Sequence, residues 1–94
     1  MKHNALMHNP EDDVAVVIED IKAGATVSAV DLDGQPQQAV DAVQDIPLGH
    51  KIALRDMAAD HRVIKYGRSI GKTSQAIAKG AHVHTHNVKS ERWA

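Results

Sequence analysis

One short pattern occurs four times in this chain and constrains its fold more than any other feature. An Ile or Met is followed three residues later by Gly or Asp, and three residues after that by Val or Ile. The four copies, which we call turn units, are DIKAGATV (20–27), DIPLGHKI (45–52), DMAADHRV (56–63) and AIAKGAHV (76–83). We expect the first apolar residue in the core and the Gly or Asp in a left-handed turn conformation. A strand should then begin at the β-branched residue. Four such units predict a compact all-β fold.

The segments between the turn units also favour β structure. Residues 14–18 form a β-branched run suited to a buried strand, and residues 63–66 form a second short strand. The Asp-Gly pair and Pro within residues 31–36 predict a turn. Residues 37–44 fit a helix or a strand and are interpreted as a strand, whereas residues 71–78 could form one helical turn.

The composition indicates a folded protein with a small core. Hydrophobic residues make up 43% of the chain and charged residues 24%, which is typical of folded rather than disordered sequences. There is no Phe, and there is one Tyr and one Trp, so aliphatic side chains must fill the core. A small core without aromatic rings favours dependence on a partner. No linker or low-complexity segment is present, so residues 1–94 are predicted to form a single domain.

Several classes of protein are excluded. Because there is no Cys, disulfides and thiolate metal sites are impossible, and a reducing compartment is expected. The longest apolar run, residues 14–18, is too short to span a membrane, and the N-terminus has no signal-peptide core. The basic residues are dispersed and lack interleaved aromatics, so nucleic-acid binding is not expected. We therefore expect a cytoplasmic protein without membrane or nucleic-acid partners.

Formal charge divides the chain into an acidic and a basic half. Residues 1–48 contain two Lys against nine acidic residues, a balance of −7, whereas residues 49–94 contain nine Lys and Arg against three, a balance of +6. The carboxylates at 11–13 and 19–20 are interpreted as a solvated edge. The basic half favours an anionic ligand or an acidic partner surface.

Three alternating histidines, His82, His84 and His86, are the first candidate site. On a strand they would project from one face about 7 Å apart. Neutral imidazoles spaced in this way can share a zinc or ferrous ion. No Asp, Glu or Cys nearby would complete the coordination, so metal ligands, substrate contacts and a polar strand face all stay open.

His50 and Lys51 are the second candidate site. They follow Gly49 at the beginning of a predicted strand, where Gly allows a ligand to approach the backbone closely. Lys51 could hold a carboxylate or sulfonate as a point charge, and His50 could donate to an oxyanion. An ordinary solvated turn is the alternative.

Residues 64–72 combine glycines with three basic side chains, but they lack the spacing of a phosphate-binding loop. A basic hairpin is therefore favoured there. No catalytic constellation is complete in the sequence, so the chain alone is not expected to be an enzyme.

A family resemblance narrows these possibilities. Residues 46–87 resemble the N-terminal module of the altronate and galactarate dehydratases, and the resemblance continues upstream through residues 8–24. Its most specific pieces are GHK (49–51), VIKYG (63–67), IG (70–71) and GAHVHTHN (80–87). The module belongs to the SAF superfamily, so the resemblance implies a small β-clip domain. In the dehydratases a large catalytic domain follows, whereas this sequence ends soon after the module. We therefore expect the small subunit of a two-chain lyase.

Within that family, the chain is most similar to the small (alpha) subunits of the sulfolactate sulfo-lyases. The resemblance implies elimination of sulfite from 3-sulfolactate to give pyruvate, and dependence on iron (Fe²⁺) held mainly by a large (beta) catalytic subunit. An anionic 2-hydroxy acid is the expected substrate. The expected substrate contacts are His50, Lys51, His82, His84 and His86. The alternatives are the small subunit of a sugar-acid dehydratase and a non-catalytic SAF binding module.

Overall fold

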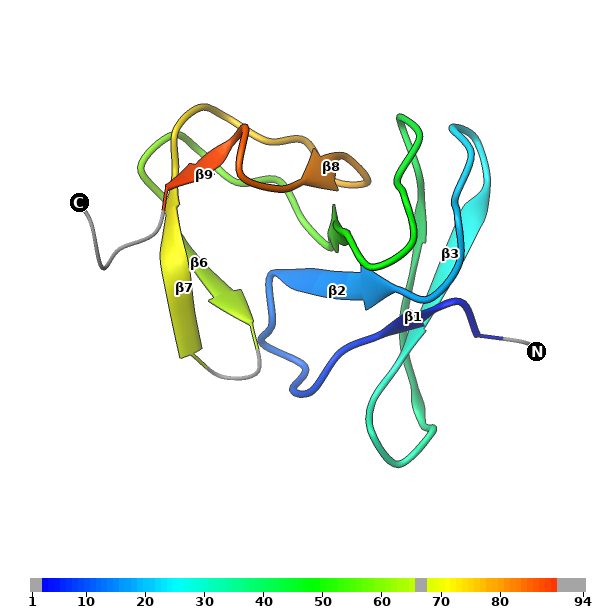
Figure 1. Ribbon diagram of the computed structural model, residues 1–94. Coiled ribbons are helices and arrows are strands. Elements are labelled where there is room, and N and C mark those ends of the chain that lie inside the picture. The colour runs from blue at the N-terminus through cyan, green and yellow to red at the C-terminus, as the bar shows by residue number, and fades with distance from the viewer. Residues whose placement is uncertain (1–2, 66–67, 90–94) are drawn as a thin grey trace.

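The protein is built from short β-strands (Figure 1). The computed structural model describes residues 3–65 and 68–89, and within them there are nine strands and no helix. The strands are β1 (Ala5–Leu6), β2 (Val14–Val17), β3 (Thr26–Val30), β4 (Pro36–Asp41), β5 (Lys51–Ala53), β6 (Arg62–Lys65), β7 (Arg68–Thr73), β8 (His82–Val83) and β9 (Val88–Lys89). The predicted all-β fold is therefore confirmed.

The strands form two sheets. The larger has the order β4-β3-β1-β2-β5-β8, and the smaller has the order β6-β7-β9. Neighbouring strands are antiparallel except β1 and β3, which are parallel. The β3–β4 hairpin contains the predicted turn, in which Asp31 accepts hydrogen bonds from the backbone N–H groups of Asp33 and Gln35. The strand interpretation of residues 37–44 is confirmed as far as Asp41.

All four turn units have the predicted conformation. The Gly or Asp at the fifth position of each unit has a positive φ. These residues are Gly24 (90°), Gly49 (86°), Asp60 (63°) and Gly80 (87°). The leading apolar residues Ile21, Ile46, Met57 and Ile77 are at most 3% exposed, as expected for core residues. Each closing β-branched residue is buried and lies one residue inside a strand. The local pattern thus encodes a recurring turn that leads into a strand.

The turn units associate in two pairs. Ile21 forms a β-bridge with Ile46, and Met57 forms one with Ile77. We call units 20–27 and 45–52 the first pair, and units 56–63 and 76–83 the second pair. Apolar residues of the first pair lie in one hydrophobic cluster and those of the second pair in another. Each pair therefore supplies much of one small core.

Aspartate side chains link the two turn units of each pair by accepting hydrogen bonds from the backbone of the partner unit. In the first pair, Asp20 accepts the N–H of Leu48 at 2.9 Å and Asp45 accepts the N–H of Ala23 at 2.9 Å. In the second pair, Asp56 accepts the N–H of Lys79 at 2.8 Å. The fourth unit has Ala76 at the equivalent position, so the second pair has one such bond where the first has two.

Strands β2 and β5 separate the two cores. Residues alternate between the faces of a strand, so Ala15 and Val17 of β2 face the first core while Val14 faces the second. In β5, Ile52 and Ala53 divide in the same way. Figure 1 shows β2 between the β3–β4 hairpin and the β6–β7 hairpin. A strand buried on both faces explains the apolar run at residues 14–17. Ile18, the last residue of the predicted buried strand, lies beyond β2 and is 40% exposed.

Two predictions about local structure are wrong, and the first concerns residues 71–78. These residues contain no helical turn, because Gly71–Thr73 belongs to β7, which pairs with both β6 and β9. Ile77 forms the bridge of the fourth turn unit.

The strand predicted at 63–66 is β6, and its last predicted residue, Tyr66, lies outside the described residues. Nowhere in the described ranges is there a helix that could cross a membrane.

The second wrong prediction concerns Asp12 and Asp13, which do not belong to a solvated edge, whereas Glu11, Glu19 and Asp20 are exposed as predicted. Asp12 is 0% exposed and Asp13 is 4% exposed. Asp13 Oδ2 lies 3.0 Å from His61 Nε2 and 2.9 Å from the N–H of Ile64, and its Oδ1 lies 3.5 Å from Arg55 Nε. A buried carboxylate is tolerated when it is paired and hydrogen-bonded in this way. Asp13 therefore joins the start of β2 to the second pair.

Candidate functional site

Four histidines gather where β5 and β8 meet. The ring centroids of His50 and His84 are 3.9 Å apart and those of His50 and His82 are 4.9 Å apart, with nearly parallel planes. His82 lies 5.9 Å from His84 and 5.0 Å from His86, again between ring centroids. Segments more than 30 residues apart therefore supply a single cluster of imidazoles.

Two turn units position the histidine side chains: unit 45–52 contains His50, and unit 76–83 contains His82 and is followed by His84. His50 follows the left-handed Gly49 directly, and its carbonyl accepts the N–H of Val17 at 2.9 Å. The second segment begins two residues after Gly80, where β8 pairs with β5 and places His82 opposite Ile52. A Cβ at Gly49 would meet nothing within 4 Å, so this glycine is required by its turn conformation.

The predicted strand through His82, His84 and His86 is wrong beyond residue 83. Strand β8 ends at Val83, and the chain turns over residues 84–87. The buried Asn87 holds this turn, because its Oδ1 accepts the N–H of His84 at 2.9 Å and its Nδ2 donates to the carbonyl of His82 at 2.8 Å. The turn brings the rings closer together than an extended strand would, and it leaves His86 exposed.

Three of the rings could share one ligand. One ring nitrogen from each of His50, His82 and His84 lies within 4.8 Å of the other two. His50 Nδ1 and His82 Nε2 are 2.7 Å apart. His84 Nδ1 is buried and has no hydrogen-bond partner among the described residues. We call these three half-buried residues the histidine triad.

The surroundings of His82 and His84 favour neutral imidazoles. Burial lowers the pKa of His82, and nearby His86, His50, His84 and Lys51 lower it further by repulsion. Burial also lowers the pKa of His84, with further repulsion from His50, Lys51 and His86. Neutral imidazoles are metal ligands and hydrogen-bonding groups rather than cations.

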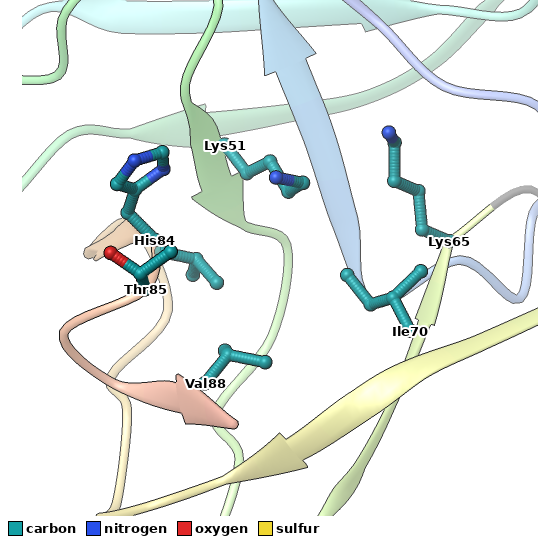
Figure 2. A pocket seen from close by; sticks show the side chains of 7 residues that line it. Lys51, Lys65, Ile70, His84, Thr85 and Val88 are labelled. Atoms are coloured by element: carbon teal, nitrogen blue, oxygen red, sulfur yellow. The ribbon is translucent and has the colours of Figure 1, made fainter. Parts of the chain in front are cut away.

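A pocket of about 300 Å³ adjoins the triad (Figure 2). Its lining combines two lysines with an apolar floor: Lys51, Lys65, Ile70, Val83, His84, Thr85 and Val88. In Figure 2, the side chain of Lys51 extends from β5 toward the side of the pocket where Lys65 lies. His84 belongs to both the pocket and the triad. The two features therefore form a continuous candidate site.

The lysines make this pocket suited to an anion. Burial lowers the pKa of Lys51, and repulsion from Lys65 lowers it further. Within the described ranges, Lys51 forms no ion pair with a carboxylate. An anion bound near both ammonium groups would relieve their repulsion, as in other sites that hold carboxylates with lysine.

The structure brings together four of the five residues predicted to contact substrate. His50, His82 and His84 form the triad, Lys51 lines the pocket, and His86 stays at the exposed margin, where it contacts His82. Their contact with a substrate stays a prediction.

Lys65 and the apolar side chains of the pocket were not predicted as site residues from the sequence. Lys65 stands in VIKYG, one of the segments that carry the resemblance, which is the signal that could have identified it. The predicted basic hairpin is β6–β7, and Lys65 is the last residue of β6.

Comparison with known proteins identifies similar chains. The profile of the altronate/galactarate dehydratase SAF domain matches residues 3–91. A (2R)-sulfolactate sulfo-lyase subunit alpha from Chromohalobacter salexigens is 40% identical over 94 residues, covering 99% of this chain and 100% of that protein. One from Paracoccus pantotrophus is 52% identical over 52 residues, covering 55% of this chain and 78% of that protein. An altronate dehydratase from Escherichia coli is 46% identical over 79 residues, which are 84% of this chain and 15% of the dehydratase.

Proposed function

The chain belongs to the altronate/galactarate dehydratase SAF domain family, and on that premise we propose that it is the small subunit of a carbon–sulfur lyase. The proposed substrate is (2R)-sulfolactate, and the products are sulfite and pyruvate. A larger subunit would complete the enzyme. The observation that carries the proposal is the match to a sulfo-lyase subunit alpha over 100% of that relative's length.

The chemistry of the pocket supports an acid of this kind. Sulfolactate carries a carboxylate and a sulfonate, and the pocket presents the ammonium groups of Lys51 and Lys65 above apolar side chains. Burial strengthens the interaction of an ammonium group with an anion, since less water competes for the charges. Two cations at one half-buried site match a substrate with two anionic groups.

The proposed reaction is a β-elimination. A base takes the proton from C2, the C3–S bond breaks, and sulfite leaves with the bonding electron pair. The enol that results then tautomerises to pyruvate. Negative charge develops on the substrate carboxylate as the proton leaves, and cations held nearby stabilise it. We propose that Lys51 and Lys65 hold the anionic groups in position, while the larger subunit provides the rest of the site.

The family resemblance also implies iron, and the histidine triad has suitable donors for it. Imidazole nitrogen is a ligand that ferrous iron accepts, and the buried Nδ1 of His84 lacks a hydrogen-bond partner among the described residues. His50, His82 and His84 are the residues that would hold such an ion. When bound, it would supply stabilisation of negative charge on the substrate.

Reconstitution with the larger subunit tests the proposed function. This chain would be co-purified with a large dehydratase-like chain encoded beside it, and sulfite and pyruvate release from (2R)-sulfolactate would be assayed. We expect turnover from the complex and none from this chain alone. A stable complex that releases no sulfite would contradict the proposal, as would turnover by this chain without a partner.

A variant tests the role of the pocket. Replacing Lys51 by Ala should lower kcat/KM about 30-fold or more, because truncating a desolvated charge contact typically costs about 2–5 kcal/mol. Lys22→Ala, at an exposed position in the first turn unit, is the matched control and should leave kcat/KM unchanged. Equal kinetics for the two variants would exclude Lys51 from substrate binding.

Sugar-acid dehydration is the second candidate function, because an altronate dehydratase is 46% identical over 79 residues. That reaction also removes a leaving group β to a carboxylate, but the leaving group is water. The same complex should be assayed with altronate and galactarate, with a 2-keto-3-deoxy acid as the product. Turnover of a sugar acid in place of sulfolactate would identify this function.

A further inference from the structure

We propose that His50, His82 and His84 together bind one divalent transition-metal ion, so that this small chain itself carries a metal of the assembled enzyme. The site would be formed where β5 and β8 meet, beside the lysine pocket. The metal-binding step concerns this chain alone. It does not depend on which acid the enzyme acts on.

The spacing of the ring nitrogens carries this inference. Two nitrogens bound to one metal at about 2.0–2.1 Å lie roughly 2.8–3.4 Å apart in octahedral or tetrahedral geometry. His50 Nδ1 and His82 Nε2 are 2.7 Å apart, and all three candidate nitrogens lie within 4.8 Å of one another. Side-chain shifts of about an ångström or less would therefore place all three around one ion.

One buried nitrogen of the triad lacks a hydrogen-bond partner among the described residues, and a bound ligand would supply one. Among the described residues, no group accepts from or donates to the buried Nδ1 of His84. The contact between His50 and His82 joins one imidazole to another, so it satisfies one nitrogen of each ring. Structural histidines are normally fixed by a carboxylate or a carbonyl. An ion bound to all three rings would fix their tautomers together.

The backbone around the triad is firmly held. The carbonyl of His50 and the N–H of Gly49 both bond to Val17 of β2, and Asn87 holds both His82 and His84. The N–H of His82 also donates to the side chain of Gln44 at 3.0 Å. Ligands carried on fixed backbone need little ordering when an ion binds.

Three protein ligands leave coordination positions open for a substrate. His84 lines the lysine pocket as well as the triad, so an acid in the pocket would lie next to the ion. One oxygen-bearing end of the acid could bind the metal while the other anionic end contacts Lys51. This orientation of the substrate, unlike the metal site itself, rests on the proposed function.

Metal binding by the isolated full chain tests the inference. The protein, prepared without a histidine tag and treated with a chelator, would be titrated with CoCl₂ and followed by visible absorption and calorimetry. We expect one Co²⁺ per chain and a d–d spectrum typical of nitrogen ligands. His50→Ala, His82→Ala and His84→Ala should each weaken binding about tenfold or more, since even indirect changes around a metal cost about 10–100-fold.

His86→Ala is the matched control, because His86 contacts His82 but lies outside the triad. It should change the Co²⁺ affinity by less than about threefold. Urea unfolding would verify that each variant is folded, and His84→Gln would replace His84→Ala if the latter were unstable. Failure of the wild-type chain to bind Co²⁺, or equal binding by a variant lacking all three histidines, would overturn the inference.

The result can be separated from the proposed function. If the complex released sulfite from sulfolactate while this chain bound no Co²⁺, the metal inference would fail and the proposed function would stand. If this chain bound one Co²⁺ through the triad while the complex released no sulfite, the metal site would stand and the proposed reaction would fail.

Discussion

His50 and His61 occupy the same position in two turn units, directly after the left-handed residue, but their surroundings differ. His61 Nε2 lies 3.0 Å from the buried carboxylate of Asp13, which also accepts the N–H of Ile64. His50 Nδ1 lies 2.7 Å from His82 Nε2, and its ring stacks on His84. One imidazole has a fixed acceptor, whereas the other faces imidazoles whose hydrogen bonding is incomplete.

The comparison separates what the turn unit determines from what it leaves open. The unit determines where the histidine emerges from the backbone, because the left-handed residue and the following strand fix that position. The role of the histidine depends on which distant segment lies against it. For His61 that segment is the start of β2, and for His50 it is β8 together with the turn that follows it. The same local geometry thus gives a structural contact between His61 and Asp13 in one unit and a candidate binding site in the other.

The change expected to have the largest effect breaks the turn that delivers His82. Gly80 has φ +87°, and a Cβ there would lie 2.1 Å from the backbone oxygen of Asp41. Gly80→Ala combines left-handed strain with a backbone collision, so we expect the free energy of unfolding to fall by about 4 kcal/mol. Urea denaturation of the purified chain would measure this loss.

Gly24→Ala is the control for the strain alone. Gly24 has φ +90°, but a Cβ there would meet nothing within 4 Å. The expected loss is about 1–2 kcal/mol. Equal losses for Gly80→Ala and Gly24→Ala would show that the predicted collision at Gly80 is relieved by a backbone shift.

Removing the acceptor of His61 is expected to have the next largest effect. Asp13→Ala leaves His61, Arg55 and the N–H of Ile64 without the carboxylate that joins β2 to the second pair. We expect a loss of about 2–3 kcal/mol, reduced from the cost of a fully buried pair because Arg55 and His61 are partly exposed. Asp33→Ala, at an exposed position, should change stability by less than about 0.5 kcal/mol. A similar small change for Asp13→Ala would remove the contrast between the two histidines.

Truncating the two histidines tests the comparison directly. His61→Ala should lower the free energy of unfolding by about 1–1.5 kcal/mol, because a hydrogen bond to a buried carboxylate is lost. His50→Ala in the metal-free protein should cost about 0.5 kcal/mol, since only one hydrogen bond between two half-buried imidazoles is lost. Paired urea titrations would give both values. The interpretation would be wrong if His50→Ala were the more destabilising of the two.

The last expected effect is a small gain in stability. Ala76→Asp would place a carboxylate where the other three turn units have one, facing the N–H of Ala59. One added hydrogen bond of this kind should raise the free energy of unfolding by about 0.5–1 kcal/mol. Ala78→Asp, two residues away and exposed, supplies the same charge without the geometry. Equal stability of the two variants would show that the carboxylates do not act through these bonds.

Local chemistry explains which parts of the fold could be predicted from the sequence. The turn units depend on φ preferences and β-branching within eight residues, so all four were predicted with their buried apolar positions. The pairing of Ile21 with Ile46, and of Met57 with Ile77, joins units that the local pattern does not distinguish. The helical turn expected at residues 71–78 was wrong because Gly71–Thr73 is held as a strand by β6 and β9.

The candidate site was predicted in composition but not in shape. Alternating histidines predicted a shared strand face, yet the side chain of Asn87 holds a turn instead. From the sequence, His50 and the histidines of residues 82–86 are separate candidates, because only the β5–β8 pairing brings them together. The burial of Asp13 likewise depends on distant partners, His61 and Arg55.

The outer edge of the larger sheet has a further consequence, for aggregation. Strand β4 lies at this edge, so its outer backbone groups could pair with a strand of another molecule. Its first residue, Pro36, has no N–H to donate, the pairing with β3 is irregular at Ala29 and Val30, and the charged Asp41 ends it. Proline, irregular pairing and charge are features that discourage edge-to-edge association. Pairing of β4 with the edge strand of another copy, the first step of fibril growth at this edge, is therefore disfavoured.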